Sequence, residues 1–144
     1  MSRNSPRFLL DVNTLVALAD REHVHYRVVT RWFDSTGRSG WGVCAFTEAG
    51  FLRVSIAARS HSVGAASELL RRFAQHPGYR YWPVTAGWST LVSPFRDRIY
   101  GHQQITDAFL LGLAVKGNGV LVTLDKALAH LAGTEYRRHL LVLE

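Results

Sequence analysis

Short apolar runs alternate with longer amphipathic stretches along this chain. Runs of mainly apolar or aromatic residues, which are typical of strands, occupy 8–10, 41–44, 79–84, 120–123 and 140–143. Stretches with apolar residues at helical spacing predict helices over about 22–34, 47–58, 62–75, 106–116 and 127–131. Strands that alternate with helices favour an α/β fold with a mostly parallel central sheet.

The length and composition indicate one domain. The chain has 144 residues, of which 47% are hydrophobic, so it can bury a core and is not globally disordered. We expect a single domain over 1–144, with an ordered core over about 7–143. No run of eighteen apolar residues is present, which excludes a membrane-spanning helix. The single cysteine, Cys44, cannot form an internal disulfide, and the N-terminus lacks a secretory signal, so we expect a cytoplasmic protein.

The charge balance is basic. The chain has seventeen Lys and Arg residues and eleven Asp and Glu residues, which gives a net charge of +6, and only Lys116 and Lys126 are lysines. Arginine binds phosphate through two parallel hydrogen bonds and stacks on bases, so this composition is compatible with a nucleic-acid partner. A GC-rich genome also replaces Lys by Arg without functional cause, so charge alone leaves both interpretations open.

Four of the acids occupy unusual positions. Asp11 follows the first predicted strand directly, and Asp125 follows the strand over 120–123; ligands bind at this carboxyl edge in open α/β sheets. Glu48 and Asp107 lie in predicted helices whose neighbouring positions are apolar, where a carboxylate is costly unless it is paired or binds a metal. Each acid alone also fits a simple helix cap or first-turn position.

Convergence of these four acids would require a cation or bound protons. Two unit charges about 4 Å apart repel by about 4 kcal/mol at an effective dielectric constant near 20. A set of carboxylates without Cys or His suits Mg²⁺ or Mn²⁺ rather than zinc. An acidic pocket in an otherwise basic domain is the arrangement expected for cutting a phosphodiester bond, with the metal activating a water molecule.

Four segments resemble, in order and spacing, the sequence blocks of PIN-domain ribonucleases. The likeness is closest to the VapC toxins of bacterial VapBC toxin–antitoxin systems. The segments are Phe8–Leu18 (FLLDVNTLVAL), Phe46–Arg53 (FTEAGFLR), Ile105–Ala114 (ITDAFLLGLA) and Leu121–Leu128 (LVTLDKAL). Each block alone is a weak signal, whereas four in order cover nearly the whole chain.

This resemblance implies a fold and an activity. The fold would be an α/β/α sandwich around a short parallel sheet, usually assembled as a homodimer. The activity would be Mg²⁺- or Mn²⁺-dependent endonucleolytic cleavage of RNA, leaving a 3′-hydroxyl and a 5′-phosphate. A small cognate VapB-like antitoxin would bind the toxin and block its acidic pocket.

The resemblance also implies residue roles. Asp11 and Asp107 match the principal metal ligands, and Glu48 and Asp125 match the acids that complete the pocket directly or through water. Two further residues, Asn13 and Thr123, match polar neighbours that orient the carboxylates. Residues 101–104 (GHQQ) depart from the family, because many relatives carry a basic or small polar residue there.

Two other functions stay open from the sequence. A non-catalytic RNA- or protein-binding module on a PIN-like scaffold is one, although degenerate relatives lose acids that this chain retains. A phosphatase of the haloacid-dehalogenase type is the other, but that family needs an Asp where this chain has Asn13.

Two smaller motifs have mainly structural interpretations. His23 and His25, two positions apart on a predicted helix, should point in different directions and lie on the surface. The aromatic run Tyr79–Trp82 alternates as a strand would, so we expect part of it in the core, with base stacking by the rest as the functional alternative.

Overall fold

The computed structural model describes residues 7–144, so the part of the single-domain prediction that covers 1–6 lies outside the described residues. Its four strands form one parallel sheet in the order β2-β1-β3-β4. The strands are β1 (Phe8–Leu10), β2 (Trp41–Gly42), β3 (Val120–Thr123) and β4 (Leu140–Val142). The predicted α/β class with a parallel sheet is confirmed.

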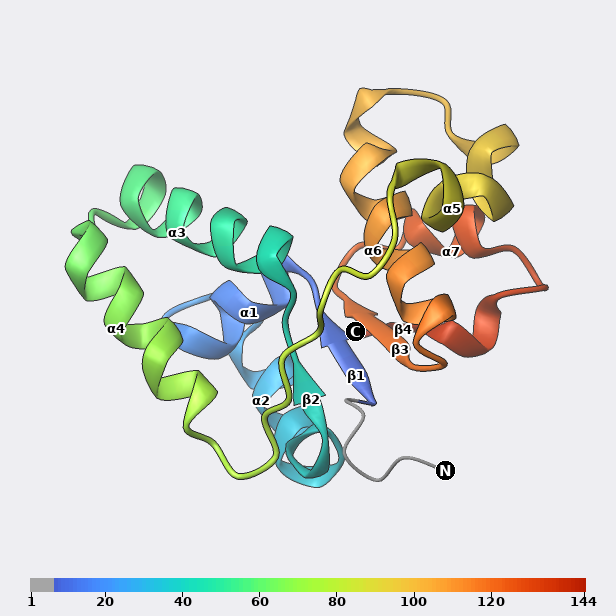
Figure 1. The fold of residues 1–144 in the computed structure, drawn as a ribbon. Helices are drawn as coiled ribbons and strands as arrows, with labels where there is room; N and C mark the ends of the chain where they lie inside the picture. Colours follow the sequence, from blue (N-terminus) through green and yellow to red (C-terminus); the bar gives the residue numbers. More distant parts are fainter. Residues whose placement is uncertain (1–6) are drawn as a thin grey trace.

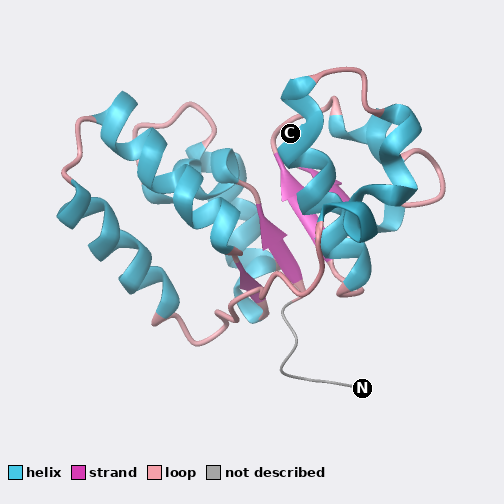
Figure 2. Ribbon diagram, turned by 45° about the horizontal axis from the view of Figure 1, so that its top comes forward, coloured by secondary structure: helices cyan, strands magenta, loops and turns pink. Residues whose placement is uncertain are grey.

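Helices cover both faces of this sheet (Figures 1 and 2). On one side lie α1 (Val12–Ala19), α2 (Tyr26–Ser35), α3 (Ala45–Arg59) and α4 (Val63–Ala74). On the other side lie α5 (Trp88–Val92), α6 (Ile105–Lys116) and α7 (Leu128–Ala132). Within residues 7–144, no helix is both long enough and apolar enough to cross a lipid bilayer.

Alternating side chains of the central strands supply two cores. Leu9 and Leu121 belong to the core under α5–α7, whereas Phe8, Leu10 and Val122 belong to the core under α1 and α2. All five side chains are buried, because successive residues of a strand point to opposite faces and both faces are covered here. This explains why these strands read as unbroken apolar runs.

Helix α6 packs closely against α5. A Cβ added at Gly112 would lie 2.0 Å from the carbonyl oxygen of Leu91, so only glycine allows this approach of the two backbones. The contact fixes the position of α6, whose first turn carries Asp107.

One predicted strand is wrong and one predicted helix begins later than expected. The segment 79–84 is a loop with a bridge between Tyr79 and Trp41, although the Arg80 and Trp82 amides also donate to the carbonyl oxygens of Trp41 and Val43. The alternation arises because Trp82 is buried beneath the loop and donates from its indole nitrogen to the Phe8 carbonyl oxygen at 3.2 Å. Helix α2 begins at Tyr26 rather than near residue 22, since residues 21–25 form turns.

Candidate metal centre and nucleic-acid interface

Asp11 is the first residue after β1 and caps the N-terminus of α1. Its Oδ1 accepts a hydrogen bond from the Thr14 amide at 2.9 Å, and its Oδ2 accepts one from the Thr123 hydroxyl at 2.6 Å. The residue is 7% exposed, and this burial raises the pKa of Asp11 even though both hydrogen bonds act in the opposite direction. A carboxylate held this rigidly at a strand end is well placed to bind a ligand at the carboxyl edge.

Asp107 lies in the first turn of α6. Partial burial, followed by the charges of Asp11 and Asp125, raises the pKa of Asp107 to about 6. Asp107 and Asp125 line the same hollow, and Asp11 is linked to the Asp125 backbone through Thr123. The three acids come from three separate segments of the chain, which meet at the edge where β1 and β3 end.

Asp125 follows β3 and is linked to Asp11 through one threonine. The Thr123 hydroxyl, which donates to Asp11, also accepts a hydrogen bond from the Asp125 amide at 3.0 Å. The Asp125 Oδ1 in turn accepts one from the Ala127 amide at 2.9 Å. A single side chain therefore orients the acid after β1 and fixes the backbone that carries the acid after β3.

Two hollows meet at Asp125. One, of about 380 Å³, is lined by both Asp107 and Asp125. The other, of about 510 Å³, is lined by Asp125 together with Asn13, His23 and His25. Asp125 thus lies between two open cavities, which is suitable for a ligand that extends past it on both sides.

Glu48 lies at the start of α3, where its neighbour Thr47 is hydrogen-bonded to the carbonyl oxygen of Leu10, the residue before Asp11. Partial burial raises the pKa of Glu48. Burial, followed by the charge of Glu48, raises the pKa of Tyr79 to about 12. The charge of Glu48 does not contribute to the raised pKa of Asp107. Asn13 is exposed, and among residues 7–144 it forms no hydrogen bond with a carboxylate.

The two histidines differ from the prediction. They lie in the turn before α2 rather than on a helix, and their ring centroids are 5.7 Å apart. The His25 amide donates to His23 Nδ1 at 3.0 Å, which holds the two rings near each other. Both line the hollow beside Asp125 instead of pointing apart.

Two threonines that the sequence analysis missed support the site. The Thr14 hydroxyl donates to the Val122 carbonyl oxygen at 3.1 Å, and the Thr47 hydroxyl donates to the Leu10 carbonyl oxygen at 2.9 Å. Both residues are fully buried and tie the starts of α1 and α3 to the ends of β3 and β1. In the sequence, the only sign of this role was a threonine close to an acid at a predicted strand–helix junction. Threonine is also common at helix starts that have no functional role, so this sign is not specific.

The donor chemistry of the aspartates fits a hard divalent cation. Within residues 7–144, no group of three or more His, Cys, Asp or Glu side chains is placed to hold a metal ion by itself. Mg²⁺ commonly binds through one or two carboxylates and keeps several water ligands, so Asp11 and Asp107 with water are a suitable set. The mutual repulsion that raises the pKa of Asp107 is what such a cation would relieve.

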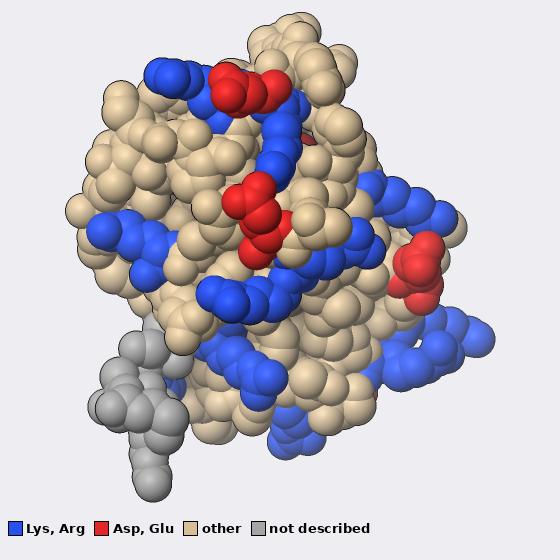
Figure 3. All heavy atoms as spheres, turned by 90° about the vertical axis from the view of Figure 1, so that its right-hand side faces the viewer, with Lys and Arg blue, Asp and Glu red and all other residues tan. Residues whose placement is uncertain are grey.

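One face of the molecule carries more basic than acidic side chains. Figure 3 looks onto the side that carries α5–α7, where Lys and Arg side chains are spread over the face and outnumber the acids. An acidic site in a basic surface agrees with the electrostatic pattern expected from the sequence, and such a surface attracts a polyanion.

Comparison with known proteins identifies the family. Residues 8–134 match the PIN domain. The chain belongs to the PIN-domain family. Among curated members it is related to ribonuclease VapC44 of Mycobacterium tuberculosis, with 38% identity over 126 residues, covering 85% of this chain and 89% of the relative. Ribonuclease VapC39 of the same organism is 35% identical over 125 residues, covering 84% and 90% of the two chains.

A solved structure confirms the PIN-like fold. The chain superimposes with a TM-score of 0.66 on a crystal structure of VapBC2 from Rickettsia felis bound to a DNA fragment from their promoter. The match covers 95% of this chain and 98% of that chain at 13% sequence identity, so it supports the fold alone. The sandwich predicted from the resemblance is therefore the observed architecture.

Proposed function

We propose that this PIN-domain protein is a VapC-like toxin of a toxin–antitoxin system and acts as a Mg²⁺- or Mn²⁺-dependent endoribonuclease. The observation that carries the proposal is the placement of three aspartates at the carboxyl edge of the sheet: Thr123 links Asp11 to the Asp125 amide, and Asp107 and Asp125 line one hollow. The curated relatives are ribonucleases, and their alignments with this chain cover most of both sequences. The products would carry a 3′-hydroxyl and a 5′-phosphate.

Each acid has a distinct proposed role. Asp11 and Asp107 would hold the metal directly, while Asp125 and Glu48 would complete the pocket directly or through water. The bound cation would lower the pKa of a water molecule and neutralise charge that develops on the phosphate. Thr123 fixes the orientation of the Asp11 carboxylate, and exposed Asn13, which lines the second hollow, would contact the substrate there.

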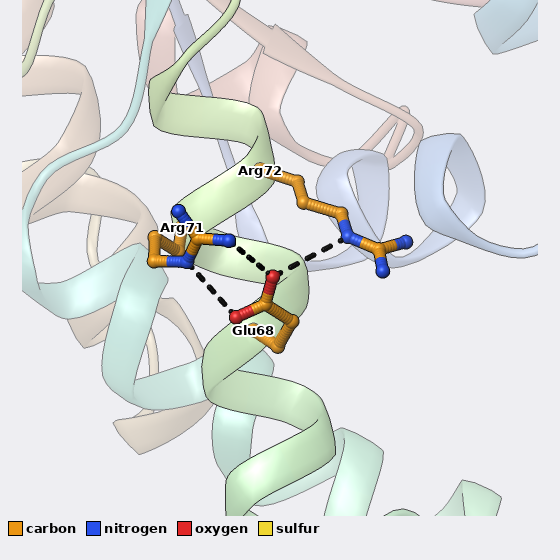
Figure 4. A network of polar contacts seen from close by, with 3 residues as sticks. All are labelled: Glu68, Arg71 and Arg72. Atoms are coloured by element: carbon orange, nitrogen blue, oxygen red, sulfur yellow. Dashed lines mark hydrogen bonds and ion pairs between the residues drawn. The ribbon is translucent and has the colours of Figure 1, made fainter.

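RNA binding would rely on arginines that have no acidic partner. Some basic side chains are paired: Arg71 and Arg72 both contact Glu68 on α4, at 2.5 and 3.5 Å (Figure 4), and Arg98 pairs with Glu135 at 2.8 Å. Seventeen basic residues exceed the available acids, so many positive charges remain for phosphate contacts. Binding should therefore weaken steeply as salt concentration rises.

The proposed protein partners are a VapB-like antitoxin and a second copy of this chain. Phe46 and Trp88 are 43% and 38% exposed, and both rings pack around Phe109, with centroid distances of 4.6 and 6.2 Å. Such an exposed aromatic cluster supports a protein–protein contact. Light scattering of the purified chain should give the mass of a homodimer, and Phe46→Ser should shift it toward the monomer.

Digestion of RNA tests the proposed activity. Total cellular RNA is incubated with the purified protein in Mg²⁺, in Mn²⁺ or in EDTA, and the new 5′ ends are mapped by a ligation that requires a 5′-phosphate. We expect discrete cuts that need a divalent cation. If RNA is bound but never cut with either metal, the protein is instead a non-catalytic RNA-binding module.

A further inference from the structure

The hollow of about 380 Å³ beside Asp107 has a lining that differs from a phosphate site. It contains two carboxylates, Asp107 and Asp125, and none of its described lining residues is Lys or Arg. Apart from the cation that Asp107 would hold beside the scissile phosphate, this lining has no positive charge that could bind a second phosphate. The part of a nucleotide that fits such a cavity is therefore its uncharged base rather than its backbone.

The remaining lining residues match the shape and polarity of a nucleobase. Tyr100 contributes an aromatic ring that is 77% exposed, and Leu128 and Leu131 contribute aliphatic surface. Gln103 contributes an amide, which offers both hydrogen-bond donors and acceptors. A base has two apolar faces and a polar edge, so an aromatic ring, aliphatic side chains and an amide are complementary to it.

The segment that carries these side chains is held in place. The Tyr100 amide donates to Gln104 Oε1 at 2.5 Å, which closes the turn that contains Gln103. The Tyr100 ring lies beside the His130 imidazole, with a centroid distance of 5.6 Å and an interplanar angle of 30°. Tyr100 is thus supported from α7 while most of its surface stays open to solvent.

We propose that this cavity, which we call the base pocket, binds one unpaired nucleobase next to the scissile phosphate, with Tyr100 stacking on it and Gln103 reading its edge. This inference rests on the proposed ribonuclease function and adds to it a binding site for one base beside the metal centre. It also assigns a role to Gln103, which lies in the short turn directly before α6.

Paired changes in protein and RNA test the base pocket. The probe is a fluorescein-labelled single-stranded RNA spanning a mapped cleavage site, with an abasic nucleotide at one position at a time. Binding is measured by anisotropy on chains that also carry Asp107→Asn, so that the RNA stays intact. Tyr100→Ala should weaken binding of the intact RNA about tenfold or more, the loss expected for one base-stacking contact. Tyr100→Phe should retain the affinity, and His102→Ala, in the same loop but outside the pocket lining, should change it little.

The decisive readout is the coupling between the two changes. At one nucleotide position, removing the base should weaken binding to the chain that retains Tyr100 but not to the chain that carries Tyr100→Ala. At the same position, Gln103→Ala should reduce the preference of the protein among the four bases. If the effects of Tyr100→Ala and of every abasic nucleotide simply multiply, the base pocket is refuted while metal-dependent cleavage by the wild type stands. If the wild type neither binds nor cuts RNA, the proposed function itself fails.

Discussion

Replacing Asp107 by asparagine should stabilise the folded protein at neutral pH while it removes a proposed metal ligand. Burial and the charges of Asp11 and Asp125 raise the pKa of Asp107 from 3.8 to about 6. A tenfold change in an equilibrium corresponds to about 1.4 kcal/mol, so ionising this carboxyl costs about 3 kcal/mol more in the folded protein than in the unfolded chain. Because the side chain is only partly buried, solvent screening reduces our expectation to about 1–2 kcal/mol.

The sign of the effect depends on pH. A carboxyl whose pKa is raised by folding favours the folded state below its unfolded pKa of 3.8, and this contribution is lost as pH rises to about 6. Asp107→Asn carries no charge at any pH, so its advantage over the wild type should be absent near pH 3.8 and complete above pH 6. At neutral pH this corresponds to a rise in Tm of roughly 3–8 °C for a domain of this size.

The difference in stability between the wild type and Asp107→Asn is measured by chemical and thermal unfolding, which circular dichroism monitors across this pH range in the absence of divalent cation. Asp34→Asn is the matched control, because Asp34 is exposed on α2 and far from the other acids in the sequence. Adding Mg²⁺ should stabilise the wild type and narrow its gap to Asp107→Asn, since a ligand stabilises the state that binds it. A loss of stability in Asp107→Asn at neutral pH, or a difference that does not change with pH, would refute the reasoning.

Two further substitutions test the supports of the site. Thr123→Val removes the 2.6 Å hydrogen bond to Asp11, so we expect the pKa of Asp11 to rise further. The Mg²⁺ affinity, measured by calorimetry, should fall about 10- to 100-fold. Thr123→Ser keeps the hydroxyl and should retain the wild-type affinity. Gly112→Ala forces a Cβ to 2.0 Å from the Leu91 carbonyl oxygen and should lower the free energy of unfolding in urea by about 1–3 kcal/mol or more. In Gly64→Ala the nearest atom to the new Cβ is 3.9 Å away, so that change should instead raise stability by roughly 0.4–1 kcal/mol. Equal effects of the two glycine substitutions would contradict the close α5–α6 packing.

The sequence predicted the central strands because their burial is complete. Phe8, Leu10 and Val122 face one core and Leu9 and Leu121 the other, so apolar residues are required at every position. The loop over 79–84 misled the same reasoning. The segment runs beside β2, and the Trp82 amide donates to the Val43 carbonyl oxygen at 3.0 Å, but the pairing amounts to a single bridge, and periodicity alone does not distinguish this from a strand.

The candidate acids were predictable because they sit at the ends of strands or in first helical turns. Their relative placement was not, since it depends on the sheet order: β3 lies next to β1 and brings Asp125 toward Asp11, while Glu48 follows β2 on the other side. Thr123 was named from a resemblance, and only the structure shows that its hydroxyl links Asp11 to the Asp125 amide. The turn at His23 and His25 was missed because their apolar neighbours continue the helical pattern of α2.

The most direct test of the central claim compares cleavage by the wild type and by Asp107→Asn on the same mapped RNA. Both proteins are shown to be folded, and single-turnover cleavage is followed over a range of Mg²⁺ concentrations. We predict metal-dependent cleavage by the wild type, with 5′-phosphate products, and none by the variant at any Mg²⁺ concentration. Cleavage by Asp107→Asn at the wild-type rate would show that the aspartates at the sheet edge are not the catalytic centre.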